Sequence, residues 1–129
     1  SVVEIDEYAF ANCTRIKNLV VPESVSTIGQ SAFAGCTSLT TIVLPAQLSE
    51  VSQRMFFGCK TLASIVVPQG VKKIGAHAFD GCISLAQVTI PDTLEHIGHW
   101  AFYGCKWQPP EHFGESSAGN LTGADSSLF

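Results

Sequence analysis

Apolar and polar positions along this chain follow a pattern that returns every 23 residues. Each copy has a phenylalanine followed three residues later by a cysteine, and aliphatic side chains recur in phase with both. So many columns in phase over five copies predict a repeat protein whose inward side chains form one continuous core. The most regular predicted core columns are Phe10, Cys13, Phe33, Cys36, Phe56, Cys59, Phe79, Cys82, Phe102 and Cys105.

The first part of each copy predicts one short β-strand. In residues 39–45, LTTIVLP, apolar and polar side chains alternate, so Ile42 and Leu44 point inward while Thr41 and Val43 point outward. Proline has no amide hydrogen to donate to a ladder, so Pro45 ends the strand. Strands of successive coils are expected to pair in parallel, about 4.8 Å apart, as one curved sheet.

The second part of each copy brings the chain back to the start of the next strand. In residues 48–59, LSEVSQRMFFGC, the apolar side chains Val51, Met55, Phe56 and Cys59 are three and four residues apart. Such spacing predicts helical or 3₁₀ turns on the return leg. One coil cannot bury its own inner face, whereas stacked coils can, so the predicted fold class is an α/β repeat solenoid.

The residue before each cysteine predicts a left-handed turn. Glycine precedes the last four cysteines, while the first copy has Asn12 in the place that Gly35 takes in the second. Asparagine is among the non-glycine residues that best tolerate a positive φ, so this replacement favours a backbone requirement over a mere need for a small side chain.

Three stretches carry a resemblance to a known family. Residues 28–45 (IGQSAFAGCTSLTTIVLP), 74–91 (IGAHAFDGCISLAQVTIP) and 97–105 (IGHWAFYGC) resemble BspA-type leucine-rich repeats, and the resemblance covers residues 2–105. It implies a right-handed superhelical solenoid with a parallel sheet on its concave face. It also implies non-enzymatic work by protein–protein contact, often in surface proteins that adhere to other proteins.

The repeat pattern divides the chain into two parts. Residues 1–105 make about five coils and begin mid-repeat, since Val2 and Ile5 match Val25 and Ile28, so further coils or another element are expected upstream. Residues 106–129 leave the register and are rich in proline, glycine and serine. We expect Trp107 and Phe113 to cap the last coil, and residues 115–129 to form a polar, flexible tail.

Composition excludes several functions. A net charge of −4 argues against nucleic acid as a partner, and no apolar run approaches the roughly 20 residues that span a bilayer. No closely spaced cysteine pair indicates zinc, and no phosphate-binding glycine loop is present. The sequence therefore predicts no catalytic, cofactor-binding or metal-binding residues, and no enzyme.

The five cysteines leave alternatives open. A column at constant period favours buried thiols that pack as small apolar groups, although a disulfide between neighbouring coils or a catalytic thiol is also conceivable. His77 and His99 lie one coil apart and are expected to approach each other on the outer face, most simply as surface side chains without a role.

Two surfaces are candidates for binding a protein partner. The first is the outward face of the concave strands, where stacked valines lie beside small uncharged side chains. It comprises Asn18, Val20, Thr41, Val43, Ser64, Val66, Gln87 and Thr89. The second is the convex side near the C-terminus, where aromatic side chains would anchor an interface. It comprises Phe57, Trp100, Tyr103 and Trp107.

These surfaces give two hypotheses for function. The first is an adhesive or recognition module that binds partner proteins through the concave sheet. The second is a structural or accessory subunit of a larger assembly, held by the convex aromatic edge and the C-terminal tail. The family resemblance favours the cell surface or secretion, whereas unpaired cysteines favour a reducing interior.

Overall fold

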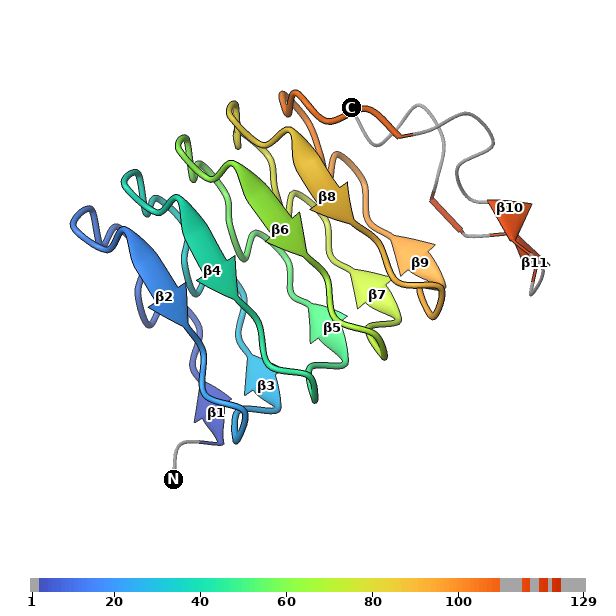
Figure 1. Cartoon of the computed structure of the whole chain (residues 1–129), viewed down its shortest axis with the longest axis horizontal. Helices are drawn as coiled ribbons and strands as arrows, with labels where there is room; N and C mark the ends of the chain where they lie inside the picture. The colour runs from blue at the N-terminus through green and yellow to red at the C-terminus, as the bar shows by residue number, and fades with distance from the viewer. Residues whose placement is uncertain (1–2, 110–114, 117–118, 121, 124–129) are drawn as a thin grey trace.

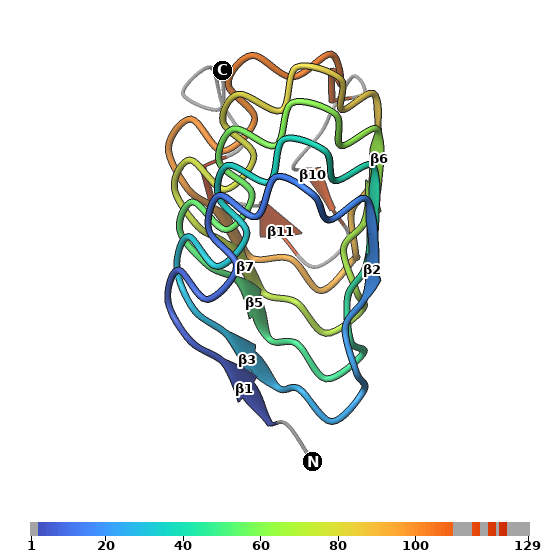
Figure 2. The same ribbon diagram turned by 90° about the vertical axis from the view of Figure 1, so that its left-hand side faces the viewer.

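The computed structural model describes residues 3–109, 115–116, 119–120 and 122–123. One row of strands comprises β2 (Asn18–Val20), β4 (Thr41–Val43), β6 (Ser64–Val66) and β8 (Gln87–Thr89). A second row comprises β1 (Glu4–Ile5), β3 (Thr27–Ile28), β5 (Glu50–Val51), β7 (Lys73–Ile74) and β9 (His96–Ile97). A short antiparallel pair, β10 (Glu115–Ser116) and β11 (Gly119–Asn120), follows. The two rows run along the stack in Figure 1, and Figure 2 shows the coils overlaid.

The first row confirms the predicted strands and their register. Thr41 lies opposite Asn18, and Ser64 lies opposite Gln87, so partners are one repeat apart and parallel. The prediction of one continuous sheet is wrong, because the hydrogen-bonded ladders join β2 to β4 and β6 to β8 but not β4 to β6. Strands β4 and β6 still lie side by side in Figure 1.

The return legs correct the prediction of helical or 3₁₀ turns. The described part of the chain contains no helix; each return leg instead starts with a second-row strand and continues as overlapping turns. Alternate amides donate in two directions. The N–H groups of Tyr8 and Phe10 donate to the next coil, whereas that of Ala9 donates three residues back, to Asp6. This alternation provides hydrogen-bond partners for the backbone N–H groups, some within the same coil and some in the next coil.

Left-handed residues explain why no helix forms. Asn12 has φ of 61° and Gly35 has φ of 73°, which confirms the predicted left-handed turn before the cysteine. A second left-handed column stands four residues earlier, with φ of 55–60° at Tyr8, Ser31, Arg54, His77 and Trp100. A right-handed helix cannot continue through such residues, so the return leg must turn.

The phenylalanine column forms the centre of the core. Neighbouring rings from Phe10 to Phe102 stack with centroids 5.2–5.7 Å apart. All except Phe10 are fully buried, and Phe10 and Cys13 on the first coil are half-buried. The predicted cap is present at the other end, where the ring of Trp107 lies 4.7 Å from that of Phe102 and is only 9% exposed.

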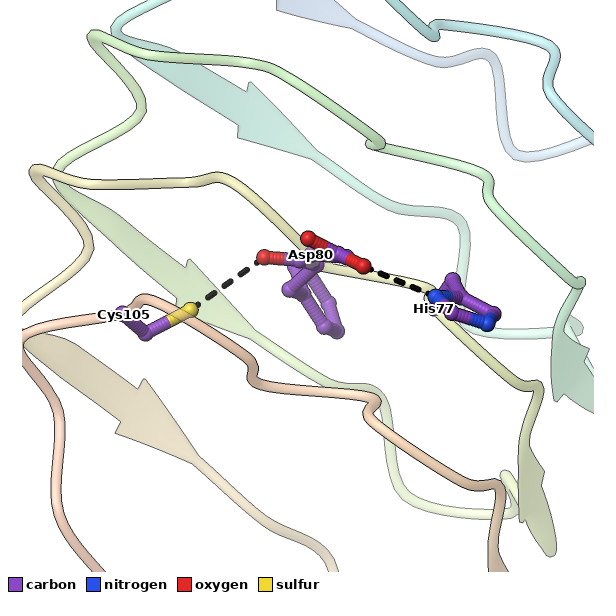
Figure 3. A network of polar contacts seen from close by, with 4 residues as sticks. His77, Asp80 and Cys105 are labelled. Atoms are coloured by element: carbon purple, nitrogen blue, oxygen red, sulfur yellow. Dashed lines mark hydrogen bonds and ion pairs between the residues drawn. The ribbon is translucent and has the colours of Figure 1, made fainter. Parts of the chain in front are cut away.

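The cysteine column is a ladder of thiols that donate hydrogen bonds. Cys36, Cys59, Cys82 and Cys105 each place Sγ 3.1–3.2 Å from the carbonyl oxygen of the phenylalanine in the preceding coil. Figure 3 shows the Cys105 thiol in this position. Each of these carbonyl oxygens also accepts a hydrogen bond from the backbone N–H of the cysteine in its own coil. The Phe79 carbonyl, for example, accepts one from the N–H of Cys82. All five cysteines are free, so the packed-thiol interpretation holds.

Native thiols are expected to react unequally with an alkylating reagent at pH 8. Burial raises the pKa of Cys36 to about 11 and that of Cys105 to about 12. The Cys59 thiol and burial also hold the pKa of Cys82 far above its usual range. From 9.0 to about 11 the thiolate fraction falls about 100-fold, and a buried sulfur is also hard to reach. The Cys82 thiol instead lowers the pKa of Cys59, so that sulfur is protected by its complete burial alone. Mass spectrometry should find half-buried Cys13 labelled first and the other four only after unfolding; rapid native labelling of all five would contradict the ladder.

The second row continues beyond the last coil. The amide of Ile97 donates to the Thr122 carbonyl, and that of Thr122 donates to the Glu95 carbonyl. The Thr122 hydroxyl also lies 2.7 Å from Nδ1 of His96. Thr122 therefore covers the edge of β9 within the segment predicted to be a flexible tail. Phe113, the other predicted cap residue, lies outside the described residues.

Candidate functional site

The outward side chains of the first row form a two-column surface, which we call the strand face. Because side chains on a strand alternate, β2, β4, β6 and β8 each contribute two outward positions. One column is polar and the other is mainly valine. The strand face consists of Asn18, Val20, Thr41, Val43, Ser64, Val66, Gln87 and Thr89, as the sequence predicts for the strands' outward positions.

The valine column is exposed to an unusual degree for apolar side chains. The exposed fractions are 70% for Val20, 54% for Val43 and 63% for Val66. In the polar column, the Thr41 hydroxyl donates to Asn18 Oδ1 at 2.6 Å, so these neighbours are held together. No acid or base belongs to the strand face, so contact with a partner would desolvate no ionised group on it.

A depression lies where the two hydrogen-bonded pairs of strands separate. It has a volume of about 520 Å³ and lies between β4 and β6. Most of its lining is apolar, and two polar side chains complete it. The apolar lining residues are Ile42, Val43, Leu44, Ala46, Val66 and Pro68, and the polar ones are Glu23 and Gln69. The strand face thus has a hollow beside the C-terminal ends of β4 and β6, and a side chain of a partner would find mainly apolar walls there.

The second candidate surface is an aromatic ridge, formed by Phe57, His77, His99, Trp100 and Tyr103. Trp100 stacks on His99 and Tyr103, with ring centroids 5.1 and 5.3 Å away, and meets His77 edge-on at 5.6 Å. Phe57 lies 6.5 Å from His77. The structure therefore gathers the predicted Phe57, Trp100 and Tyr103 and adds both histidines, whose rings each contact Trp100.

Two further contacts refine the ridge. His77 Nδ1 lies 2.7 Å from Asp80 Oδ2, an intra-turn contact that orients the imidazole (Figure 3). Trp107 does not belong to the ridge, because its ring packs on Phe102 inside the stack. The prediction of Trp107 as an exposed partner-binding residue is therefore corrected to a role in the core.

Comparison with family models decides the family. The model for the BspA type leucine rich repeat region matches residues 1–108 in six copies. The chain belongs to the BspA-type leucine-rich repeat family. Members of this family are generally non-catalytic, and among residues 3–109, 115–116, 119–120 and 122–123 no three His, Cys, Asp or Glu side chains gather as a metal site requires.

Several solved structures share the fold. A leucine-rich cell surface protein of Faecalibacterium prausnitzii is 34% identical with a TM-score of 0.79; the match covers 81% of this chain and 28% of that one. A leucine-rich repeat protein of T. pallidum is 38% identical with a TM-score of 0.80, over 84% of this chain and 51% of that one. The pneumococcal vaccine antigen PcpA is 25% identical with a TM-score of 0.61; the match covers 84% of this chain and 29% of that one.

This BspA-type chain thus spans from about a quarter to about half of the length of these three relatives. A search among curated proteins finds no match. In the described part of the chain there is no helix that could cross a membrane.

Proposed function

We propose that this chain is a non-enzymatic recognition module that binds a partner protein through the strand face. The observation that carries the proposal is the apolar hollow between β4 and β6, flanked by Val43 and Val66. A partner's apolar side chain seated there would contact mainly apolar walls, with Glu23 and Gln69 as the polar groups of the lining. Such an arrangement of an apolar pocket with a polar surround is typical of protein interfaces.

The polar column supports specificity for a protein surface. Hydroxyl and amide groups stand in a line along this column, with neighbouring strands about 4.8 Å apart. They belong to Asn18, Thr41, Ser64 and Gln87. These groups both donate and accept hydrogen bonds, as peptide groups and polar side chains of a partner require. Apolar contact would then supply most of the affinity, and the polar column would select the partner.

The comparisons support an adhesion-type role at the cell surface. The F. prausnitzii relative is described as a cell surface protein, and the pneumococcal relative is a vaccine antigen. We extend that location to this chain as part of the proposal, together with the absence of enzymatic activity. The concave placement of the strand face, which the family resemblance implies, would bring both columns within reach of one convex partner.

A second candidate function is that of a structural or accessory subunit held by the aromatic ridge. The continuous ring contacts from Phe57 to Tyr103 across three coils favour it. However, Trp100 already stacks on two neighbouring rings, so less of its surface is left for a partner. We therefore place recognition on the strand face first.

The double variant Val43→Glu/Val66→Glu is expected to lose partner binding. Two carboxylates would stand beside the apolar hollow, and burying them against a partner without counter-charges is costly. The wild-type and variant proteins are immobilised, exposed to an extract of the source organism, and the captured proteins are quantified by mass spectrometry. The protein that the wild type retains in stoichiometric amount should fall at least about tenfold with the variant.

Val3→Glu is the matched control, because Val3 is an equally exposed valine outside the strand face. It should retain the partner, and both proteins should unfold at the temperature of the wild type because the replaced side chains are exposed. Full retention by the double variant, or equal loss with Val3→Glu, would contradict recognition through the strand face. Loss with Tyr103→Ala alone would favour the ridge.

A further inference from the structure

A second hollow in the described structure is a trough along the second row of strands. It has a volume of about 710 Å³ and crosses β1, β3, β5, β7 and β9. Its floor column begins with Asp6 on the first coil and continues with the small residues Gly29, Ser52, Gly75 and Gly98, and columns of longer side chains border it on both sides. The trough exists because the glycines leave no side chain between the two borders.

Close contact between coils requires those glycines. A Cβ added to Gly29 would lie 2.5 Å from the backbone nitrogen of Glu7, and one added to Gly98 would lie 2.3 Å from that of Ala76. The floor is therefore a fixed consequence of coil stacking. Its backbone donors and acceptors are used between coils, as in the bond from Gly98 N–H to the Ile74 carbonyl, so an occupant would have to bind through the borders.

Charge is segregated along the trough. Glu4, Asp6, Glu7 and Glu50 line the part of the trough on the first three coils. Lys73, His96 and His99 line the part on the last two. Outside the lining, Lys72 adds positive charge beside Lys73, and Glu95 stands beside His96. Within the described chain the only ion pair is His77–Asp80, so none of the lining carboxylates is held in an ion pair there, although Glu50 lies opposite Lys73 in the β5–β7 ladder.

Uncharged side chains lie between the two charged ends. Gln30 and Gln53 border the middle of the trough, with Thr27 opposite. A glutamine amide both donates and accepts, which matches the N–H and C=O groups of a peptide. Five coils about 4.8 Å apart span about 19 Å, and an extended peptide at about 3.3 Å per residue covers that length with about six residues.

The geometry points to a second interaction surface: the trough of the second row binds an extended peptide segment of a partner protein. That segment has lysine or arginine in one half, over Glu4, Asp6, Glu7 and Glu50, and aspartate or glutamate in the other half, over Lys73. Charge complementarity fixes its register along the coils. The trough and the strand face belong to different rows of strands, so this surface is independent of the proposed function.

Two synthetic hexapeptides test the trough, each acetylated and amidated. The charge-segregated peptide is Lys-Arg-Gly-Ser-Asp-Glu, and its scrambled control, Lys-Asp-Gly-Ser-Arg-Glu, has the same composition. Titration at low ionic strength is followed by the backbone amide NMR signals of Gly75 and Gly98 on the floor. The segregated peptide should bind about tenfold more tightly than the scrambled one, and added salt should reduce the difference.

Charge-reversal variants locate the effect. Lys73→Glu should remove the preference for the segregated peptide, whereas Lys17→Glu, the same change at an exposed lysine outside the trough, should leave it intact. The double variant Val43→Glu/Val66→Glu should bind both peptides as the wild type does. Equal affinity for the two peptides, or shifts that avoid the floor glycines, would overturn the proposal. Unchanged preference in Lys73→Glu would overturn it as well.

Discussion

Replacing Phe56 by alanine is expected to lower the free energy of unfolding by about 3–5 kcal/mol, the largest loss among the substitutions considered. Phe56 is fully buried in the middle coil, and its ring stacks on Phe33 at 5.7 Å and on Phe79 at 5.3 Å. Its removal leaves a cavity that interrupts the column, and each coil of a solenoid depends on its neighbours. Chemical denaturation followed by circular dichroism measures the loss.

Phe57 provides the matched control at the next position. Its side chain is 39% exposed and belongs to the ridge. Phe57→Ala should cost no more than about 1 kcal/mol, because it removes a partly hydrated ring with one distant aromatic contact. If the two alanine variants were equally stable, the phenylalanine column would not be the centre of the core.

Gly98→Ala is expected to be the second most damaging change, at about 3 kcal/mol. The new Cβ would lie 2.3 Å from the backbone nitrogen of Ala76, and backbone cannot swing aside as a flexible side chain can. The neighbouring coils must separate locally, which weakens bonds such as the one from His77 N–H to the His99 carbonyl. Denaturation should show the loss, and hydrogen exchange should show faster exchange at the amide of His77.

Ser52 occupies the same column two coils earlier and gives the control. A side chain is accommodated there, and its hydroxyl donates to the Ile28 carbonyl. Ser52→Ala should therefore cost about 1 kcal/mol, the value of one hydrogen bond, without opening the coils. Stability of Gly98→Ala close to that of the wild type would show that the coils are less tightly spaced than the structure has them.

The inward columns could be predicted because burial imposes one period on the sequence. Every coil must present an apolar group at the same place in the core. Phe33, Phe56 and Phe79 therefore recur at equal intervals along the chain, and each ring stacks on the next. The same reasoning gave the strand register and the left-handed turn at Asn12, where only asparagine and glycine occur. The cap by Trp107 followed from its place just after the last coil.

The return leg was mispredicted because spacings of three and four are shared by helices and by successive turns. The second left-handed column, Tyr8, Ser31, Arg54, His77 and Trp100, contains neither glycine nor asparagine, so no residue type signalled it. Tertiary hydrogen bonds between coils impose that conformation. The second row of strands, and with it the trough, depends on the same bonds and was therefore missed.

The candidate surfaces were predictable in part. Alternation along the strands identified the strand face, because outward positions need only suit a pleated surface. The hollow at Val43 and Val66 could not be predicted, since it arises where β4 and β6 fail to join in one ladder. Every repeat has nearly the same strand sequence, so nothing in the pattern distinguishes that junction from the others.

Site-specific photo-cross-linking tests the central claim, that a protein partner binds the strand face, most directly. Benzoyl-phenylalanine is placed in separate variants at Val43 on the strand face, at Tyr103 on the ridge and at Glu50 in the trough, all exposed positions. Each variant is irradiated in an extract of the source organism, and adducts are identified by mass spectrometry. A discrete adduct from Val43 with the protein that the wild type captures is the predicted result. An adduct with that protein from Tyr103 or Glu50, and none from Val43, would contradict it.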